Sequence, residues 1–91
     1  MTPIEIVNHL SEVNPEALLL EPRSVYDDAL IGYQEREGMV VAVYDIDALI
    51  ELASEVTGSN DWIDNADHVS FNITGSWMGP GTPEFQYGGE E

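Results

Sequence analysis

The sequence contains no cysteine and no lysine. Without cysteine the chain has no disulfide, no thiolate nucleophile and no thiolate metal ligand. Its two arginines, Arg23 and Arg36, are too few for the basic patch that direct phosphate binding requires, which excludes nucleic acid as a direct partner. No apolar run is long enough to span a membrane, and the start MTPIEIVNHL lacks the basic region of a signal peptide. We therefore expect a cytoplasmic protein without a membrane partner.

Acidic residues are abundant instead. Eighteen aspartates and glutamates stand against the two arginines, giving a net charge of −16 on 91 residues. The hydrophobic fraction of 43% is nevertheless sufficient for a folded core. The length predicts one domain over residues 1–87, with a frayed tail over 88–91. The order of the helices and strands described below predicts that this domain is of the α+β class. Arg23 lies among acids in the stretch EPRSVYDD and is expected to form an internal ion pair.

The beginning of the chain predicts a helix followed by a short strand. Thr2 and Glu5 have the spacing of a capping box at a helix start. The pair Asn14-Pro15 is expected to end this helix, because the residue before proline is displaced from helical geometry. Residues 16–22 then predict a strand.

The middle of the chain predicts a β-hairpin. Residues 29–36 and 39–45 have strand composition and are joined around Glu37-Gly38. The second strand is apolar almost throughout, which indicates the centre of the sheet. Gly32 predicts either a bulge or a place where another backbone comes close. With residues 16–22, the prediction is about three antiparallel strands.

Two helices are expected after the hairpin. The first begins after Asp45, a good N-cap, and ends at Gly58. The second covers residues 61–72 and is expected to be capped by Ser59 or Asn60. Its predicted inward-facing residues are Trp62, Ile63, Ala66 and Val69.

The last 17 residues, GSWMGPGTPEFQYGGEE, form a segment rich in glycine and proline. Residues 83–87 are expected to add an edge strand to the sheet. Phe71 falls away from the apolar face of the preceding helix, so we expect it to cover this segment together with Trp77. The alternative is an exposed aromatic anchor for a partner.

An acidic stripe runs along the first of the two later helices. Asp47, Glu51 and Glu55 follow one another at four-residue spacing, about 6 Å apart along the axis. Each like-charged pair costs about 0.2–0.5 kcal/mol of helix stability, and no nearby lysine relieves it. DNA phosphates repeat every ~3.4 Å of rise per strand, so carboxylates from two or three elements can imitate a phosphate track. The alternative is an ordinary solvated face.

The second of these helices carries the scattered acids Asp61, Asp64 and Asp67, which complete the predicted partner-binding set. Asp61 and Asp64 also share a face with His68, and two carboxylates and an imidazole can hold a divalent metal. The sequence offers no further ligands from other elements and no second shell. A surface contact between Asp64 and His68 is therefore the preferred interpretation, and no catalytic, cofactor or metal residue is assigned.

Three blocks, LEPRSVYDDALIGY, VVAVYDIDALIEL and FNITGSWMGPGTPEF, occur in order between about residues 21 and 85. They resemble a family of small proteins encoded by tailed phages and prophages. The shared skeleton is an acidic Tyr-Asp start, a hairpin ending in Ala-Val-Tyr, a helix, and a closing Phe-Asn…Gly-x-Trp-x-Gly…Thr-Pro-x-Phe. The resemblance implies a viral accessory origin and an ordered C-terminal motif, and it transfers no catalytic residue. The residues that carry it are Tyr26, Asp27, Ala42, Val43, Tyr44, Phe71, Asn72, Gly75, Trp77, Gly79, Thr82, Pro83 and Phe85.

Together these observations predict a non-enzymatic accessory protein that binds a basic protein partner. One form of this hypothesis is a nucleic-acid mimic that inhibits a host or viral protein in the host cytoplasm. The alternative is a viral protein of a halophilic host, whose acidity suits molar salt and whose role is structural or scaffolding. A homodimer is compatible with either hypothesis.

Overall fold

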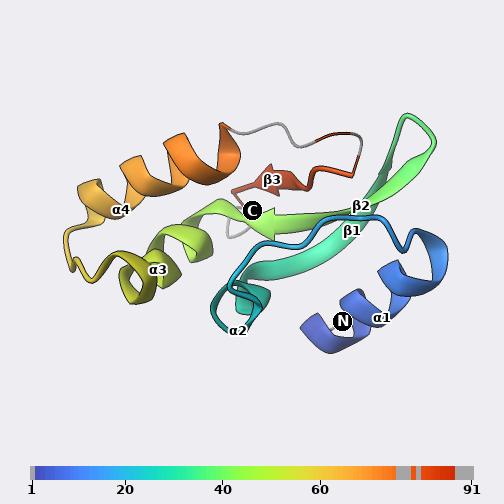
Figure 1. Ribbon diagram of the computed structural model, residues 1–91, viewed down its shortest axis with the longest axis horizontal. Coiled ribbons are helices and arrows are strands. Elements are labelled where there is room, and N and C mark those ends of the chain that lie inside the picture. The colour runs from blue at the N-terminus through green and yellow to red at the C-terminus, as the bar shows by residue number, and fades with distance from the viewer. Residues whose placement is uncertain (1, 76–78, 80, 88–91) are drawn as a thin grey trace.

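The computed structural model describes residues 2–75, 79 and 81–87. Its elements are α1 (Pro3–Val13), α2 (Arg23–Tyr26), the 3₁₀ turn η1 (Asp27–Ala29), β1 (Leu30–Arg36), β2 (Met39–Asp45), α3 (Ile46–Thr57), α4 (Trp62–Val69), the π-helical turn η2 (Ser70–Thr74) and β3 (Glu84–Gln86). The described part of the chain is thus a single domain of the predicted α+β class, with a three-stranded sheet (Figure 1). It has four α-helices, because the short α2 adds one to the three that were predicted. The tail predicted for residues 88–91 lies outside the described residues.

The sheet is mixed, with β2 at its centre. The predicted hairpin is confirmed, because β1 and β2 pair antiparallel, and the predicted bulge appears as a register shift between Leu30 and Gly32. The prediction of antiparallel strands throughout is wrong, because β3 pairs parallel to β2. The chain reaches β3 only after passing through α3 and α4, which supplies the long crossover that a parallel pair of strands requires.

The strand predicted over residues 16–22 is also wrong. This segment runs without a ladder partner among the described residues (Figure 1). Its backbone is held by separate hydrogen bonds. The amide of Leu18 donates to the carbonyl oxygen of Gly81, and that of Leu20 donates to the Tyr44 hydroxyl at 2.9 Å. A run of leucines therefore packs on the core without becoming a strand.

Helix α1 begins and ends where the sequence predicts. Both capping-box bonds are present, from the Glu5 amide to Thr2 Oγ1 and from the Thr2 amide to Glu5 Oε1. Asn14 ends the helix, and its Nδ2 donates to the carbonyl oxygen of Val40 at 2.8 Å, which ties α1 to the central strand.

The core lies between one face of the sheet, α1 and the α3–α4 pair. Full burial of an aliphatic side chain such as Ile6 or Leu49 stabilises the fold by about 1.5–3 kcal/mol. Figure 1 shows α3 continuing from the end of β2, with α4 beside it. The buried core residues are Ile6, Leu10, Leu20, Tyr26, Ala29, Leu30, Ala42, Tyr44, Leu49, Ile50, Ala53, Val69 and Ile73.

Candidate interaction surface on α3 and α4

The rotation of α3 is fixed by its two ends and its buried face. Asp45 caps the helix by accepting from the Asp47 amide at 3.0 Å, and Gly58 ends it in the left-handed conformation at φ 78°. Both ends are those predicted. Leu49, Ile50 and Ala53 are buried, so the opposite side of the helix must face solvent.

The acidic stripe of α3 lies on that opposite side. Glu51 and Glu55 are exposed and Asp47 is half-buried. None of the three carboxylates has an ion-pair partner among residues 2–75, 79 and 81–87. The three acids of the predicted stripe therefore share the outer side of α3, and its two glutamates are exposed.

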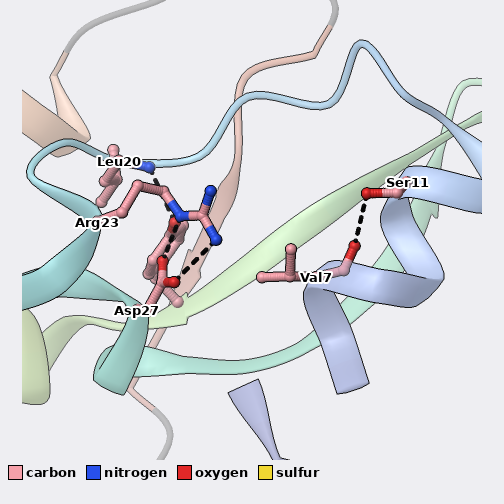
Figure 2. A network of polar contacts seen from close by, with 6 residues as sticks. Val7, Ser11, Leu20, Arg23 and Asp27 are labelled. Atoms are coloured by element: carbon pink, nitrogen blue, oxygen red, sulfur yellow. Dashed lines mark hydrogen bonds and ion pairs between the residues drawn. The ribbon is translucent and has the colours of Figure 1, made fainter. Parts of the chain in front are cut away.

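Both arginines pair with acids elsewhere in the fold. Arg23 forms the predicted internal ion pair, with its Nε 2.8 Å from Asp27 Oδ1 and its Nη2 2.9 Å from Oδ2 (Figure 2). Such two-pronged contacts are the stronger class of ion pair, and the hydrogen bond to Asp27 raises the pKa of Arg23. Arg36 connects β1 to the β3 segment, with Nη1 2.7 Å from Glu84 Oε2 and Nη2 2.7 Å from the carbonyl oxygen of Thr82.

Two of the three α4 acids are engaged in local structure. Asp61, and not Ser59 or Asn60 as predicted, caps α4, by accepting from the Ile63 amide at 2.9 Å. The Ser59 hydroxyl accepts from the Asp61 amide instead, so Ser59 lies two residues before the N-cap, outside the helix. It also donates to Asp64 Oδ2 at 3.1 Å. Asp61 and Asp64 therefore gather around Ser59.

Asp67 is different. Its side chain is exposed and has neither a hydrogen-bond nor an ion-pair partner in the part of the chain that the structure describes. It lines a cavity between α3 and α4. The six predicted partner-binding residues thus divide into a stripe on α3, a pair at the start of α4, and the separate Asp67.

The buried Asn65 decides which face of α4 points inward, and the sequence analysis missed it. Asn65 is only 3% exposed. Its Oδ1 accepts from Thr57 Oγ1 at 2.6 Å and its Nδ2 donates to the carbonyl oxygen of Ser59 at 3.0 Å. Asn65 thereby closes the α3–α4 connection. Asn65 is polar and is buried because its amide group is hydrogen-bonded. The spacing of apolar residues, from which the buried face of a helix is predicted, therefore does not identify it.

The inward line of α4 is therefore Asn65, Val69 and Ile73, at four-residue spacing. The predicted burial of Val69 is confirmed and Ala66 is half-buried. The predicted burial of Trp62 and Ile63 is wrong, because these side chains are 49% and 68% exposed.

Phe71 lies on the outside of the molecule. Its side chain is 78% exposed, so the prediction that it covers the C-terminal segment is wrong. The alternative, an exposed aromatic side chain, describes its position. Trp77, its predicted companion, lies outside the described residues.

Asp61, Asp64 and His68 do not form a metal-binding group. Within residues 2–75, 79 and 81–87, no three His, Cys, Asp or Glu side chains come together in a way that could hold a metal ion. The predicted contact between Asp64 and His68 is wrong, since Asp64 accepts from Ser59 and His68 Nδ1 lies 3.3 Å from Asn72 Nδ2.

None of the described helices is both long enough and apolar enough to cross a membrane. Comparison with protein-family models, with curated proteins and with solved structures finds no match to this chain.

Proposed function

We propose that this chain is a small acidic accessory protein of viral type that binds a basic protein in the host cytoplasm, with the acidic stripe of α3 at the centre of the contact. One observation carries the proposal. Glu51 and Glu55 are exposed without a cationic partner, while both arginines of the chain pair with other acids. The field of this surface is therefore uniformly negative.

The energetics of α3 support a binding role. Two successive like-charged pairs along the stripe cost about 0.2–0.5 kcal/mol each. Glu55 stands in the last turns of the helix, where the helix dipole disfavours a negative charge. A cationic partner removes both penalties on binding, and the net charge of −16 accelerates the encounter.

The finer form of the proposal is that the acidic surface occupies a nucleic-acid site on its partner. Asp47, Glu51 and Glu55 supply the charge track, since Asp61 and Asp64 already accept local hydrogen bonds. The partner is then a nucleic-acid-binding protein, and bound DNA competes with this chain.

The test uses a partner protein that a low-salt pull-down retains and high salt releases. The variant Asp47→Asn/Glu51→Gln/Glu55→Gln removes three charges from the stripe. Ion pairs at a protein surface are worth about 0.2–1 kcal/mol each, so titration calorimetry is expected to show roughly tenfold weaker binding of the triple variant.

A matched control removes three charges elsewhere. Glu12, Glu16 and Glu35 are exposed on α1, the following loop and β1, and their triple glutamine variant has the same net charge as the stripe variant. Its affinity is expected to change less than threefold. Equal losses in both variants, or an affinity that ignores salt, would refute the proposed surface.

A second candidate function is favoured by how widely the acids are spread. Acids stand on α1, on the loop after it, on the hairpin and on both later helices, for example Glu12, Glu21, Glu37, Glu55 and Asp64. Such dispersal suits a protein of a halophilic environment with a structural or scaffolding role, because molar salt screens self-repulsion.

Circular dichroism against potassium chloride separates the two functions. The binding proposal expects native helix content in dilute buffer. A chain that folds only near molar salt supports the halophilic alternative. Sedimentation velocity over the same salt range measures whether the chain is a monomer or a homodimer.

A further inference from the structure

A cavity of about 300 Å³ lies between the first half of α3 and the second half of α4. A cavity of about 150 Å³ is large enough to hold benzene, so this one has room for a large side chain of a partner. The residues that shape it include Ile46, Ile50, Ala66, Asp67, Ser70 and Tyr87.

The walls of the cavity combine apolar side chains with one ionisable group. Ile46 and Ile50 come from α3 and Ala66 from α4. Asp67 supplies the charge, and the exposed side chains of Asp67 and Tyr87 place the opening at the molecular surface. An apolar group with a neighbouring positive charge is the ligand chemistry that such walls fit.

The outer face of α4 extends this site. Ile63 and Asp67 of α4 and Phe71 of the adjoining π-helical turn η2 stand at four-residue spacing, which places them in one row along these two consecutive elements. Ile63 and Phe71 are 68% and 78% exposed on either side of the Asp67 carboxylate. We refer to Ile63, Asp67 and Phe71 as the α4 row. Exposed aromatic and aliphatic side chains grouped beside a cavity are typical of interaction sites.

Charge selects the occupant of the row. The chain has a net charge of −16, and both arginines pair with acids away from α4. A second copy of the chain, a nucleic acid or an anionic membrane would each bring further negative charge to this surface and be repelled by it. A positively charged helix with its own apolar side matches both the row and the cavity.

From these observations we infer that the α4 row and its cavity dock a basic amphipathic helix of a partner protein. An apolar side chain of that helix enters the cavity, and a lysine or arginine one turn away pairs with Asp67. The inference rests on the proposed function and deepens it by naming the binding element of the basic partner.

The probe is a fluorescent synthetic 18-residue peptide of leucine, lysine and one tryptophan, with leucine and tryptophan on one helical face. A second peptide of identical composition has its sequence scrambled so that no apolar face remains. Anisotropy at 0.1 M salt is expected to show at least tenfold tighter binding of the amphipathic peptide.

Three variants of the full chain test the row and its cavity directly. Phe71→Ser removes the exposed ring, Asp67→Asn removes the charge, and Ser70→Leu fills the cavity. Each is expected to weaken binding of the amphipathic peptide by about five- to twentyfold, as expected for residues at the centre of a contact.

Matched controls lie far from α4 in the sequence. Ile4→Ser removes an aliphatic side chain of α1 that is 74% exposed, and Asp28→Asn removes an exposed charge from η1. Both are expected to change affinity less than twofold. Amide chemical shifts of the labelled protein are expected to move in α4, η2 and the first half of α3.

The outcomes separate this inference from the proposed function. Equal binding of the two peptides, or equal losses in row and control variants, overturns the docking site while leaving the α3 stripe and its own test intact. Absence of binding by both peptides also overturns the docking site. A stripe variant that keeps its natural partner refutes the proposed function, whatever the peptides do.

Discussion

Two buried tyrosines differ in the hydrogen bonding of their hydroxyl groups, so we expect their replacement by phenylalanine to have opposite effects on stability. The Tyr44 hydroxyl accepts from the buried Leu20 amide at 2.9 Å. The Tyr26 hydroxyl is buried and finds no hydrogen-bond partner within the described residues. Leaving a buried amide unpaired costs about 1–3 kcal/mol, and removing an unpaired buried hydroxyl regains a similar desolvation cost.

Tyr44→Phe is therefore expected to lower the free energy of unfolding by about 1–3 kcal/mol, because it leaves the Leu20 amide without its acceptor. Tyr26→Phe is expected to raise it by about 1 kcal/mol. Each kcal/mol corresponds to a shift in Tm of about 4–8 °C for a domain of this size, which thermal circular dichroism resolves. A loss of stability in both variants would refute this assignment of the two hydroxyls.

Alkaline pH provides a second measurement on the same residues. Burial raises the pKa of Tyr44 from its ordinary value of 10.0 to about 12, and it also raises the pKa of Tyr26. The neutral phenol is thus favoured in the folded state. Its contribution to the free energy of unfolding is complete below pH 10 and is lost as the pH rises toward 12. Two pH units correspond to about 3 kcal/mol for Tyr44.

Urea unfolding at pH 9 to 12, with absorbance at 295 nm to follow phenolate formation, measures this dependence. Tyr44→Phe is expected to lower stability at pH 9 but to flatten its decline above pH 10. A decline as steep as that of the unaltered protein would contradict burial as its cause. Tyr26→Phe is expected to flatten the decline as well, since its hydroxyl is also buried.

Four further substitutions, at Gly81, Gly32 and Asp45, test the local structure. A Cβ at Gly81 would lie 2.7 Å from the backbone oxygen of Glu16, so Gly81→Ala is expected to destabilise by about 1–3 kcal/mol. Gly32→Ala, with nothing within 4 Å of its Cβ, should change stability by less than about 1 kcal/mol. Asp45→Ala removes the cap of α3 and is expected to lower stability by about 1 kcal/mol. Asp45→Asn keeps a capping oxygen and is expected to retain most of that stability. Urea denaturation checks all four, and equal effects of the two glycine variants would contradict the close approach at Gly81.

Local chemistry predicted the parts of the fold that depend on near neighbours in sequence. The capping box at Thr2, the hairpin with its bulge at Gly32, and the ends of α3 at Asp45 and Gly58 were all located correctly. Each depends on a few residues whose side chains or backbone angles act within one turn. Propensity and pattern are sufficient at that range.

Features that depend on contacts between residues distant in sequence were not predicted correctly. The leucines of residues 18–20 have the composition of a strand, yet the amides of Leu18 and Leu20 donate to the Gly81 carbonyl oxygen and to the Tyr44 hydroxyl, both distant in sequence. The parallel direction of β3 follows from the route of the crossover and not from its three residues. For the candidate site, apolar composition predicted burial of Ile63, whereas hydrogen bonds of Asn65 turn that side chain outward.

Exposure of the α4 row also bears on the choice between the two proposed functions. Acidity alone is equally compatible with a basic partner and with molar salt. In molar salt, however, the repulsion among chains of charge −16 is screened within about 3 Å. Exposed Ile63 and Phe71 would then promote self-association, because nothing opposes the burial of their apolar surface. At low ionic strength the same charge keeps the copies apart while the row remains available to a cation-bearing helix. The combination of an apolar row with unrelieved acids therefore favours binding over adaptation to salt.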